Sequence, residues 1–213
     1  MFRTIKEDIN CFLARDPAAR SALEILFLYP GFKAICMYRI AHRLYRHHLL
    51  FLARWVSQRC SKKTGIEIHP AARIGRRLFS DHGTGVVIGE TTEIGDDVTI
   101  YQGATLGGTG KDVGKRHPTL GNGVMVGAGA KVLGPLQIGD YAKIAAGAVV
   151  LTDIPPNSTA VGVPARVVRL DGVRVDSFDQ IHVPDPVAQE IARLEAEINL
   201  LKQSREENSN ENL

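Results

Sequence analysis

Several features that often reveal the class of a protein are scarce in this chain. Of its 213 residues only three are cysteines, Cys11, Cys36 and Cys60, and their spacing matches neither a zinc site nor a disulfide framework. We therefore expect reduced thiols and a cytoplasmic protein. No apolar run reaches the ~18 residues that a membrane span needs, and the charged residues 1–10 do not resemble an export signal. The sequence thus predicts no membrane association.

The chain as a whole also has almost no excess of basic over acidic residues. Lys and Arg number 26 against 23 Asp and Glu, and the formal net charge of +3 is too small to indicate nucleic-acid binding. The charge is nevertheless unevenly spread, with 12 basic and 4 acidic residues in 1–65, and 4 basic and 10 acidic residues in 171–213. Such regions are usually solvated faces. The alternative is that they attract an anionic ligand or a neighbouring subunit.

What the chain does contain is a six-residue repeat of aliphatic residues. A period of six fits neither a helix nor a simple strand alternation. It is typical of a hexapeptide β-helix, in which short strands turn a corner every six residues and three sides close one coil. Ordinary strands with accidental spacing are the alternative, which six consecutive positions in one register disfavour. The positions are Ile68 and Ile74, then Ile88, Ile94, Ile100 and Leu106, then Leu120, Val126, Val132, Ile138, Ile144 and Val150.

The repeat is flanked by segments with helical patterns. Residues 1–64 are predicted to form an N-terminal helical domain with breaks at Asp16-Pro17 and Pro30-Gly31, and one long amphipathic pattern covers 32–59. Asp16 is expected to cap the helix that follows it. Residues 65–170 form the β-helix domain, and 171–213 form a tail. A heptad pattern at about 186–203 predicts a short helix there, either at a subunit contact or packed on its own domain.

The repeat is interrupted by a polar, glycine-rich segment. Leu120 follows Leu106 by 14 positions where six would keep the register, and the inserted residues are 107–118. Such a segment must leave the coil and project from one edge. Long polar loops on rigid scaffolds often carry function.

Several motifs together resemble the bacterial serine O-acetyltransferase family. The resemblance covers Phe12 to Val168, and its most specific parts are Asp81-His82-Gly83-Thr84-Gly85, residues 105–111 and Arg116-His117-Pro118. It implies an α+β fold, in which an N-terminal α-helical domain precedes a left-handed parallel β-helix and a short C-terminal helix follows. It also implies transfer of an acetyl group from acetyl-CoA to the hydroxyl of L-serine, and assembly as a homotrimer or a dimer of trimers.

The resemblance assigns catalytic roles to two residues. His82 matches the catalytic histidine of the family, and an imidazole with an ordinary pKa of about 6.5 suits a general base that takes the proton of a hydroxyl nucleophile. Glu67 occupies the position of the carboxylate that orients this histidine, where family members often have Asp. The cysteines lie outside the motifs, so direct attack in a ternary complex is expected without an acyl-enzyme.

The resemblance also assigns the residues that bind the amino-acid substrate. Asp16 and Asp81, with Pro17 beside them, are expected at the serine ammonium group. Arg116 and His117 are expected at its carboxylate, where a guanidinium can contact two oxygens.

The resemblance also implies that coenzyme A lies along the edge of the coil, between neighbouring subunits. Small residues allow a ligand to approach the backbone closely, and lysines can contact phosphate groups. The residues predicted to bind coenzyme A are Gly108, Thr109, Ala128, Lys143 and Ala146. Lys111 and Lys131 are further candidates for contacts with its phosphate groups.

Other hypotheses remain open at this stage. The scaffold could serve an acetyltransferase for a sugar or an antibiotic, a metal enzyme of the carbonic-anhydrase type using His69, His82 and His117, or a binding protein without catalysis. The motifs favour the transferase, so no metal is predicted. The family also implies feedback inhibition by L-cysteine, and docking of the C-terminus to O-acetylserine sulfhydrylase through a terminal isoleucine, where this chain has Leu213.

Overall fold

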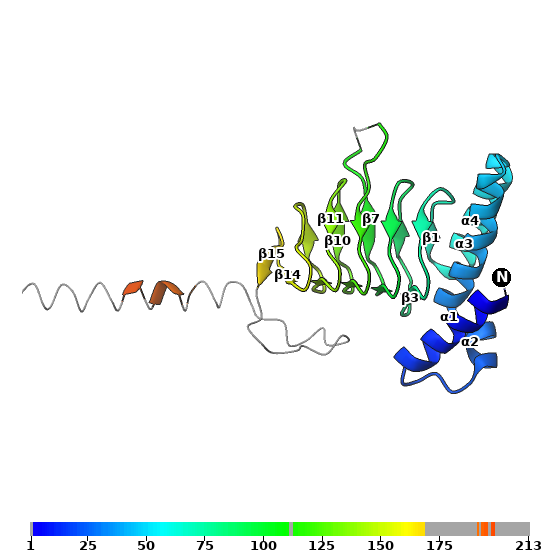
Figure 1. The fold of residues 1–213 in the computed structure, drawn as a ribbon, viewed down its shortest axis with the longest axis horizontal. Coiled ribbons are helices and arrows are strands. Elements are labelled where there is room, and N and C mark those ends of the chain that lie inside the picture. Colours follow the sequence, from blue (N-terminus) through cyan, green and yellow to red (C-terminus); the bar gives the residue numbers. More distant parts are fainter. Residues whose placement is uncertain (1, 111–112, 169–190, 192, 196, 199–213) are drawn as a thin grey trace, which may run out of the picture.

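A computed structural model of the chain describes residues 2–110, 113–168, 191, 193–195 and 197–198. Helices occupy one end of the molecule, and a long coil of short strands extends from them (Figure 1). The predicted break at Pro30 is confirmed, because proline begins the third helix, where its missing N–H is not needed. The helices before the first strand are α1 (Phe2–Arg15), α2 (Ala22–Leu28), α3 (Pro30–Arg46) and α4 (Leu50–Thr64).

Two details of the helical part differ from the predictions. The pattern over 32–59 is not one helix, because a turn separates α3 from α4 and His48 in that turn has a left-handed φ of 60°. Asp16 caps no helix, since Ser21 is the N-cap of α2 and its Oγ accepts the N–H of Glu24 at 3.2 Å. The Asp16 carboxylate instead accepts the N–H of Ala18 at 2.7 Å and closes a local turn.

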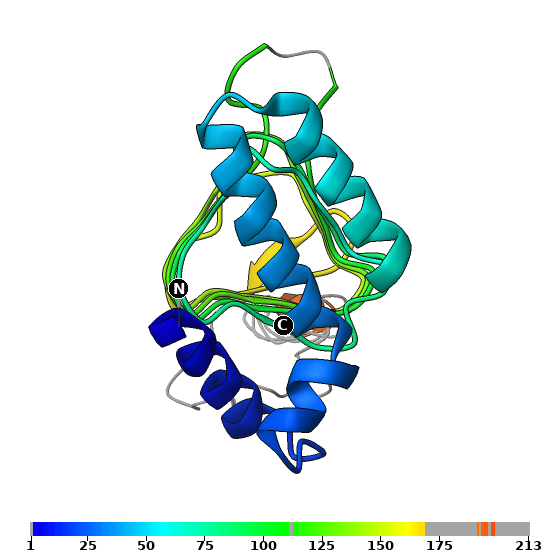
Figure 2. The same ribbon diagram turned by 90° about the vertical axis from the view of Figure 1, so that its right-hand side faces the viewer.

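The described strands form three sheets that wrap around a common core. Their orders are β1-β4-β7-β10-β13, β2-β5-β8-β11 and β3-β6-β9-β12-β14-β15, and all pairs are parallel except β14 with β15. Figure 2 looks along the coil from the helical end and shows its triangular outline, with α3 lying across the opening. The predicted hexapeptide β-helix is confirmed. The strands are β1 (Glu67–Ile68), β2 (Arg73–Ile74), β3 (Phe79–Ser80), β4 (Val87–Ile88), β5 (Glu93–Ile94), β6 (Thr99–Ile100), β7 (Thr105–Gly107), β8 (Thr119–Leu120), β9 (Met125–Val126), β10 (Lys131–Leu133), β11 (Gln137–Ile138), β12 (Lys143–Ile144), β13 (Val149–Val150), β14 (Thr159–Val161) and β15 (Arg166–Val168).

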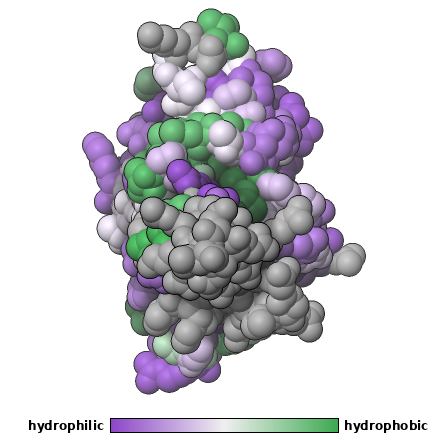
Figure 3. Space-filling view, turned by 90° about the vertical axis from the view of Figure 1, so that its left-hand side faces the viewer, coloured by the Kyte–Doolittle hydropathy of each residue, from purple (hydrophilic) through white to green (hydrophobic). Residues whose placement is uncertain are grey.

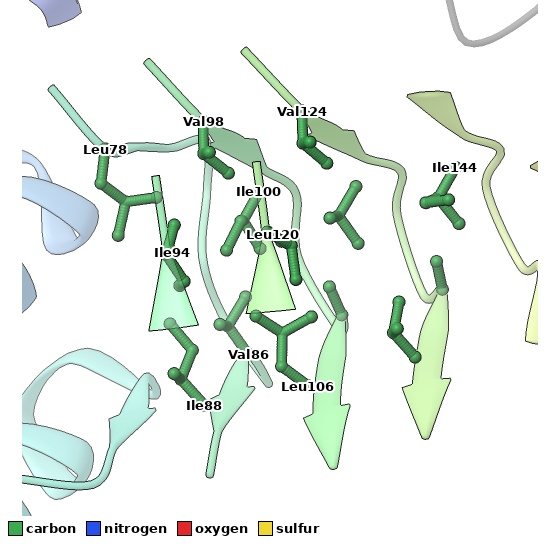
Figure 4. Close-up of a cluster of buried hydrophobic side chains, with 14 of the residues drawn as sticks. Leu78, Val86, Ile88, Ile94, Val98, Ile100, Leu106, Leu120, Val124 and Ile144 are labelled. Carbon is green, nitrogen blue, oxygen red and sulfur yellow. The ribbon is translucent and has the colours of Figure 1, made fainter. Parts of the chain in front are cut away.

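The repeated aliphatic side chains fill the inside of the coil. Those from Ile88 to Val150 are all buried, and like residues of successive coils stack on one another (Figure 4). Burying one such side chain contributes about 1.5–3 kcal/mol to folding. The core continues into the helices, where the rings of Phe12 and Phe79 pack edge to face with centroids 4.9 Å apart. The helices therefore close the open end of the β-helix with apolar contacts.

Two turns of the coil are longer than the others. Six residues, 81–86, separate Ser80 from Val87, whereas four residues, 101–104, separate their partners in the next coil. The two extra residues explain why Ile68 and Ile74 are out of register with the later repeats. The described residues of the second long turn, 108–110 and 113–118, leave the coil as predicted and project from it in Figures 1 and 2.

The turns stack into edges, and two of these edges position the candidate site. The His82 edge consists of residues 81–86, 101–104, 127–130 and 145–148. Backbone hydrogen bonds connect its turns, such as Gly129 N to Gln102 O and Gly147 N to Ala128 O, both 2.8 Å. The loop edge consists of residues 69–72, 89–92, 108–110, 113–118 and 134–136. One strand of the β1-β4-β7-β10-β13 sheet separates the two edges in each coil.

The end of the coil opposite the helices exposes apolar side chains. Figure 3 views this end, where hydrophobic residues gather and hydrophilic residues border them, and Leu151, Val163 and Val167 are exposed there. Beyond β15, the described residues Ile191, 193–195 and 197–198 are helical. The rest of the predicted tail helix, and Leu213, lie outside the described residues. The division into domains at 64/65 and 170/171 stays a prediction.

None of the helices in the described residues is both long enough and apolar enough to cross a membrane.

Candidate active site

The long turn on the His82 edge exposes an imidazole. His82 has a φ of 52°, a left-handed conformation that costs a non-glycine residue about 1–2 kcal/mol. The turn is closed by hydrogen bonds from Gly83 N to Asp81 O and from Val86 N to Gly83 O. The His82 side chain is 77% exposed, and its Nε2 lies 3.9 Å from Asp81 Oδ1. The two extra residues of the turn thus lift the imidazole off the coil.

A second carboxylate lies near this turn and comes from the end of α1. The preceding residue, Arg15, donates to Asp97 O and to Thr99 Oγ1, both at 3.1 Å, and this ties the end of α1 to the coil. The hydroxyl of Tyr29 donates to Asp16 Oδ2 at 2.7 Å. Burial and the Asp16 carboxylate raise the pKa of Tyr29 to about 12, with a smaller contribution from Asp81. Asp16 keeps lone pairs for a cation, because a carboxylate has about four acceptor positions.

Glu67 lies at the start of β1, and its carboxylate is near an arginine. Its Oε1 is 3.5 Å from a guanidinium nitrogen of Arg54, and both side chains are partly exposed. Such an exposed ion pair contributes little stability, so it constrains Glu67 weakly. The pairing of Glu67 with His82 stays a prediction.

Arg116 and His117 lie together on the loop edge, held by the turn that follows β4. The hydroxyl oxygen of Thr91 accepts the backbone N–H of Arg116 at 3.0 Å and that of His117 at 3.1 Å. The guanidinium of Arg116 donates to Glu90 Oε2 at 2.5 Å, and this hydrogen bond lowers the pKa of Glu90. The turn 89–92 therefore positions both residues that were predicted to bind the substrate carboxylate.

The protonation state of His117 follows from its contacts. The N–H of Thr91 donates to His117 Nδ1 at 3.2 Å, so Nδ1 is an acceptor and the neutral ring carries its proton on Nε2. Burial, and then the charge of Arg116, lower the pKa of His117 and favour this neutral form. The ring packs against Gly89, where a Cβ would overlap it. The neutral His117 ring thus has its N–H donor at Nε2.

The predicted substrate residues form two groups on different edges. Asp16, Asp81 and His82 gather at the His82 edge, and Arg116 and His117 gather at the loop edge. Strand β4 separates the edges, and at about 3.3 Å per residue the chain from residue 86 to 89 spans roughly 10 Å. On this spacing we expect one serine molecule to be too short to reach both groups of the same chain. Pro17 is exposed next to Asp16.

The residues predicted to bind coenzyme A also divide between the edges. Ala128 and Ala146 lie in turns of the His82 edge, and Ala146 is exposed. Gly108 and Thr109 lie at the start of the projecting loop. Lys143 lies on β12 in the sheet that ends at the His82 edge. Lys111 lies outside the described residues, whereas the ammonium of Lys131 donates to Gly103 O at 2.6 Å and to Thr105 Oγ1 at 3.1 Å.

The three histidines of the metal-enzyme hypothesis do not converge. His69 and His117 belong to the loop edge, whereas His82 belongs to the other edge. His69 accepts the N–H of Ala71 on Nδ1 at 3.1 Å, a contact that fits a structural role at a corner of the coil. Among the residues that the structure describes, no group of three or more His, Cys, Asp or Glu is placed to hold a metal ion.

Sequence reasoning assigned no role to three residues of this region. Tyr29 contacts Asp16 from 13 positions away, and no local pattern indicates that contact. Glu90 and Thr91 lie within the segment that the family resemblance covers, but their contacts with residues 116 and 117 depend on how the loop returns to the coil. The spacing of successive coils would have placed residues 89–92 beside the loop.

A hexapeptide coil with an exposed imidazole and a projecting loop defines the class of hexapeptide-repeat acyltransferases. The family model described as bacterial transferase hexapeptide (six repeats) matches residues 117–152. These residues belong to the regular coils that follow the loop.

Comparison with proteins of similar sequence shows which family of hexapeptide-repeat acyltransferases the chain belongs to. Serine acetyltransferase of Bacillus subtilis is 53% identical over 207 residues, which cover 97% of this chain and 95% of that protein. The chain belongs to the serine acetyltransferase family and is an acyltransferase.

Solved structures of serine acetyltransferases agree with the fold. The Neisseria gonorrhoeae enzyme in complex with serine has a TM-score of 0.75 and 45% identity, covering 79% of this chain and 69% of that chain. The Brucella abortus enzyme in complex with coenzyme A has a TM-score of 0.76 and 46% identity, covering 78% and 67%. A serine acetyltransferase in complex with cysteine has a TM-score of 0.77 and 47% identity, covering 78% and 69%.

Proposed function

We propose that this protein transfers the acetyl group of acetyl-CoA to the hydroxyl of L-serine, giving O-acetylserine and coenzyme A. The observation that carries the proposal is the chemistry of the two edges. One edge presents an exposed imidazole beside Asp81, with the Asp16 carboxylate near the same turn, and the other presents a guanidinium and an imidazole N–H donor. A zwitterionic amino acid with a hydroxyl side chain matches both. The serine and coenzyme A complexes of the similar enzymes support the same assignment.

The reaction follows from the predicted roles. The ammonium of serine binds at Asp16 and Asp81, and its carboxylate binds at Arg116 and His117. His82 accepts the hydroxyl proton while the oxygen attacks the thioester carbonyl. The new C–O bond forms as the C–S bond breaks, and the protonated imidazole returns the proton to the leaving thiolate.

The site requires two copies of the chain. The two groups of residues lie on different edges of one coil, so the His82 edge of one copy must face the loop edge of the next. A closed ring of three copies makes three equivalent sites of this kind. We therefore propose a homotrimer, alone or as a dimer of trimers. In this arrangement we expect the small residues Gly108, Ala128 and Ala146 to line the same junction and to leave room for coenzyme A.

Further properties follow from the same assignment. L-cysteine shares the ammonium and carboxylate of serine and would compete for its binding groups, and a similar enzyme was solved in complex with cysteine. The three free cysteines are consistent with a cytoplasmic location. Docking of the C-terminus to O-acetylserine sulfhydrylase stays a prediction.

A substrate panel tests the function. Purified protein is given acetyl-CoA with L-serine, L-homoserine, L-threonine or a sugar, and the released thiol is measured. Activity confined to L-serine is expected, whereas activity with an uncharged acceptor would reject the assignment. His82→Ala should lower kcat by at least 10²-fold. His48→Ala is the matched control, because His48 is also an exposed histidine with a positive φ but lies outside the site.

A further inference from the structure

A basic cavity lies beside α3, away from the residues of the proposed reaction. Its volume is about 550 Å³, and it is formed by the C-terminal half of α3 and by β2. The cationic and titratable side chains that line it are Arg39, His42, Arg43, Arg46, His47 and Arg73.

The charges of these arginines are only partly neutralised. Arg39 forms an ion pair with the fully buried Asp8. A guanidinium nitrogen of Arg73 lies 3.7 Å from Glu93 Oε1. The guanidinium groups of Arg43 and Arg46 form no hydrogen bond or ion pair with any residue that the structure describes, although both side chains line the cavity. Two guanidinium charges therefore remain available to an anion.

The macrodipole of α3 does not by itself explain why basic residues cluster around this cavity. Basic residues in the last turn of a helix are stabilised by its macrodipole, and Arg43 and Arg46 occupy the last turn of α3. That effect would operate equally on a flat, solvated surface. It does not explain why a further arginine, Arg73, faces the same cavity from a β-strand.

The walls of the cavity are fixed relative to each other. The hydroxyl of Tyr38, which lines the cavity, donates to Ala72 O at 2.6 Å. His42 Nδ1 lies 2.8 Å from Pro70 O. These contacts join α3 to the turn that precedes β2, so a ligand would bind without the cost of ordering the two walls.

We propose that this cavity binds a phosphate dianion, either free or carried on a small metabolite. A guanidinium matches the oxygens of a phosphate group with paired N–H donors. A phosphate monoester carries a charge of about −1.5 to −2 at neutral pH, which the two free guanidinium groups balance. The volume lies within the range of small-molecule sites and exceeds what a phosphate group alone would fill. The chain's basic N-terminal third thus contains a ligand site.

Calorimetric titration of the assembled full-length protein tests this proposal. Inorganic phosphate, glucose 6-phosphate and glucose are the probes, at low ionic strength because exposed charges are screened by salt. We expect one site per chain for each phosphate compound and none for glucose. The tighter of the two phosphate compounds identifies the ligand as the free ion or as a phosphorylated metabolite. No binding of either one would overturn the proposal.

Matched variants locate the binding. Arg43→Gln with Arg46→Gln should weaken phosphate binding at least tenfold while acetyltransferase activity stays normal. Arg59→Gln with Lys62→Gln removes the same charge from exposed positions of α4 outside the cavity and should change affinity less than twofold. Equal losses in both variants would show non-specific attraction and reject the site. Displacement of the phosphate by acetyl-CoA would place it in the acetyl-CoA site and also reject the proposal.

Discussion

Thr91 and His117 are joined by a hydrogen bond from the backbone N–H of Thr91 to Nδ1 of the imidazole, 3.2 Å long. This bond assigns the remaining proton of the neutral ring to Nε2. The hydroxyl oxygen of Thr91 also accepts the N–H groups of residues 116 and 117. One threonine of a coil turn therefore sets both the tautomer of the histidine and the path of the loop that carries it.

Replacing Thr91 tests this arrangement. Thr91→Val keeps the shape but leaves two backbone N–H groups without their acceptor, at a cost of about 1–3 kcal/mol. We expect the KM for serine to rise about tenfold and the KM for acetyl-CoA to change little. Thr91→Ser should behave like the wild type. Steady-state kinetics with each substrate varied in turn provide the measurement, and an unchanged KM for serine in the valine variant would contradict the role.

Arg116 is predicted to act through its planar fork and not through charge alone. Arg116→Lys keeps the charge, but an ammonium cannot contact Glu90 and a substrate carboxylate with the same geometry. We expect kcat/KM for serine to fall about 10–100-fold, while binding of coenzyme A stays normal by calorimetry. A lysine variant with wild-type efficiency would show that a point charge is sufficient.

The stability of the protein should depend on pH through His69 and His117. Burial is the main cause that lowers the pKa of both side chains. The unfolded chain therefore binds more protons than the folded one as the pH falls through about 6.5, and the free energy of unfolding decreases. Urea unfolding at pH 8 and pH 5.5, at one protein concentration, measures the effect. His117→Asn should reduce the difference, and an equal difference in that variant would exclude His117 as a source.

Shortening a single buried side chain in the core of the coil should lower the stability of the protein. Leu106 is fully buried between adjacent coils, and Leu106→Ala should lower the free energy of unfolding by about 2–5 kcal/mol. Leu151→Ala removes the same atoms from an exposed position and should have a much smaller effect. Urea unfolding of both variants provides the comparison. Equal losses would mean that the coil does not depend on inward packing.

The coil could be predicted from the sequence because its signal is periodic. The aliphatic residues at the repeat positions from Ile88 to Val150 were identified by spacing alone, and all of them are buried. The break between α3 and α4 was missed because no proline or glycine marks it, and His48 takes a left-handed conformation that few sequence patterns indicate. Asp16 was expected to cap a helix, but its carboxylate contacts Tyr29 and Ala18 instead.

The site was predictable only in part. His82 and Arg116 could be identified as site residues from the motifs, because a family resemblance depends on residue types. Their arrangement in space could not be predicted in this way. Their separation onto two edges follows from the number of residues in each turn, which becomes interpretable only once the coil register is known. The contacts of Thr91 could not be predicted, because they depend on a loop that returns 25 positions later.

Mixing two inactive variants tests the central claim that neighbouring copies share each site. His82→Ala and Arg116→Ala are unfolded and refolded together in equal amounts, and acetyl transfer to serine is compared with that of each variant refolded alone. In a randomly mixed trimer, about one site in four combines an intact His82 edge with an intact loop edge. We therefore predict recovery of about one quarter of the wild-type activity. No recovery in a mixture shown to contain both chains in one oligomer would contradict the shared site.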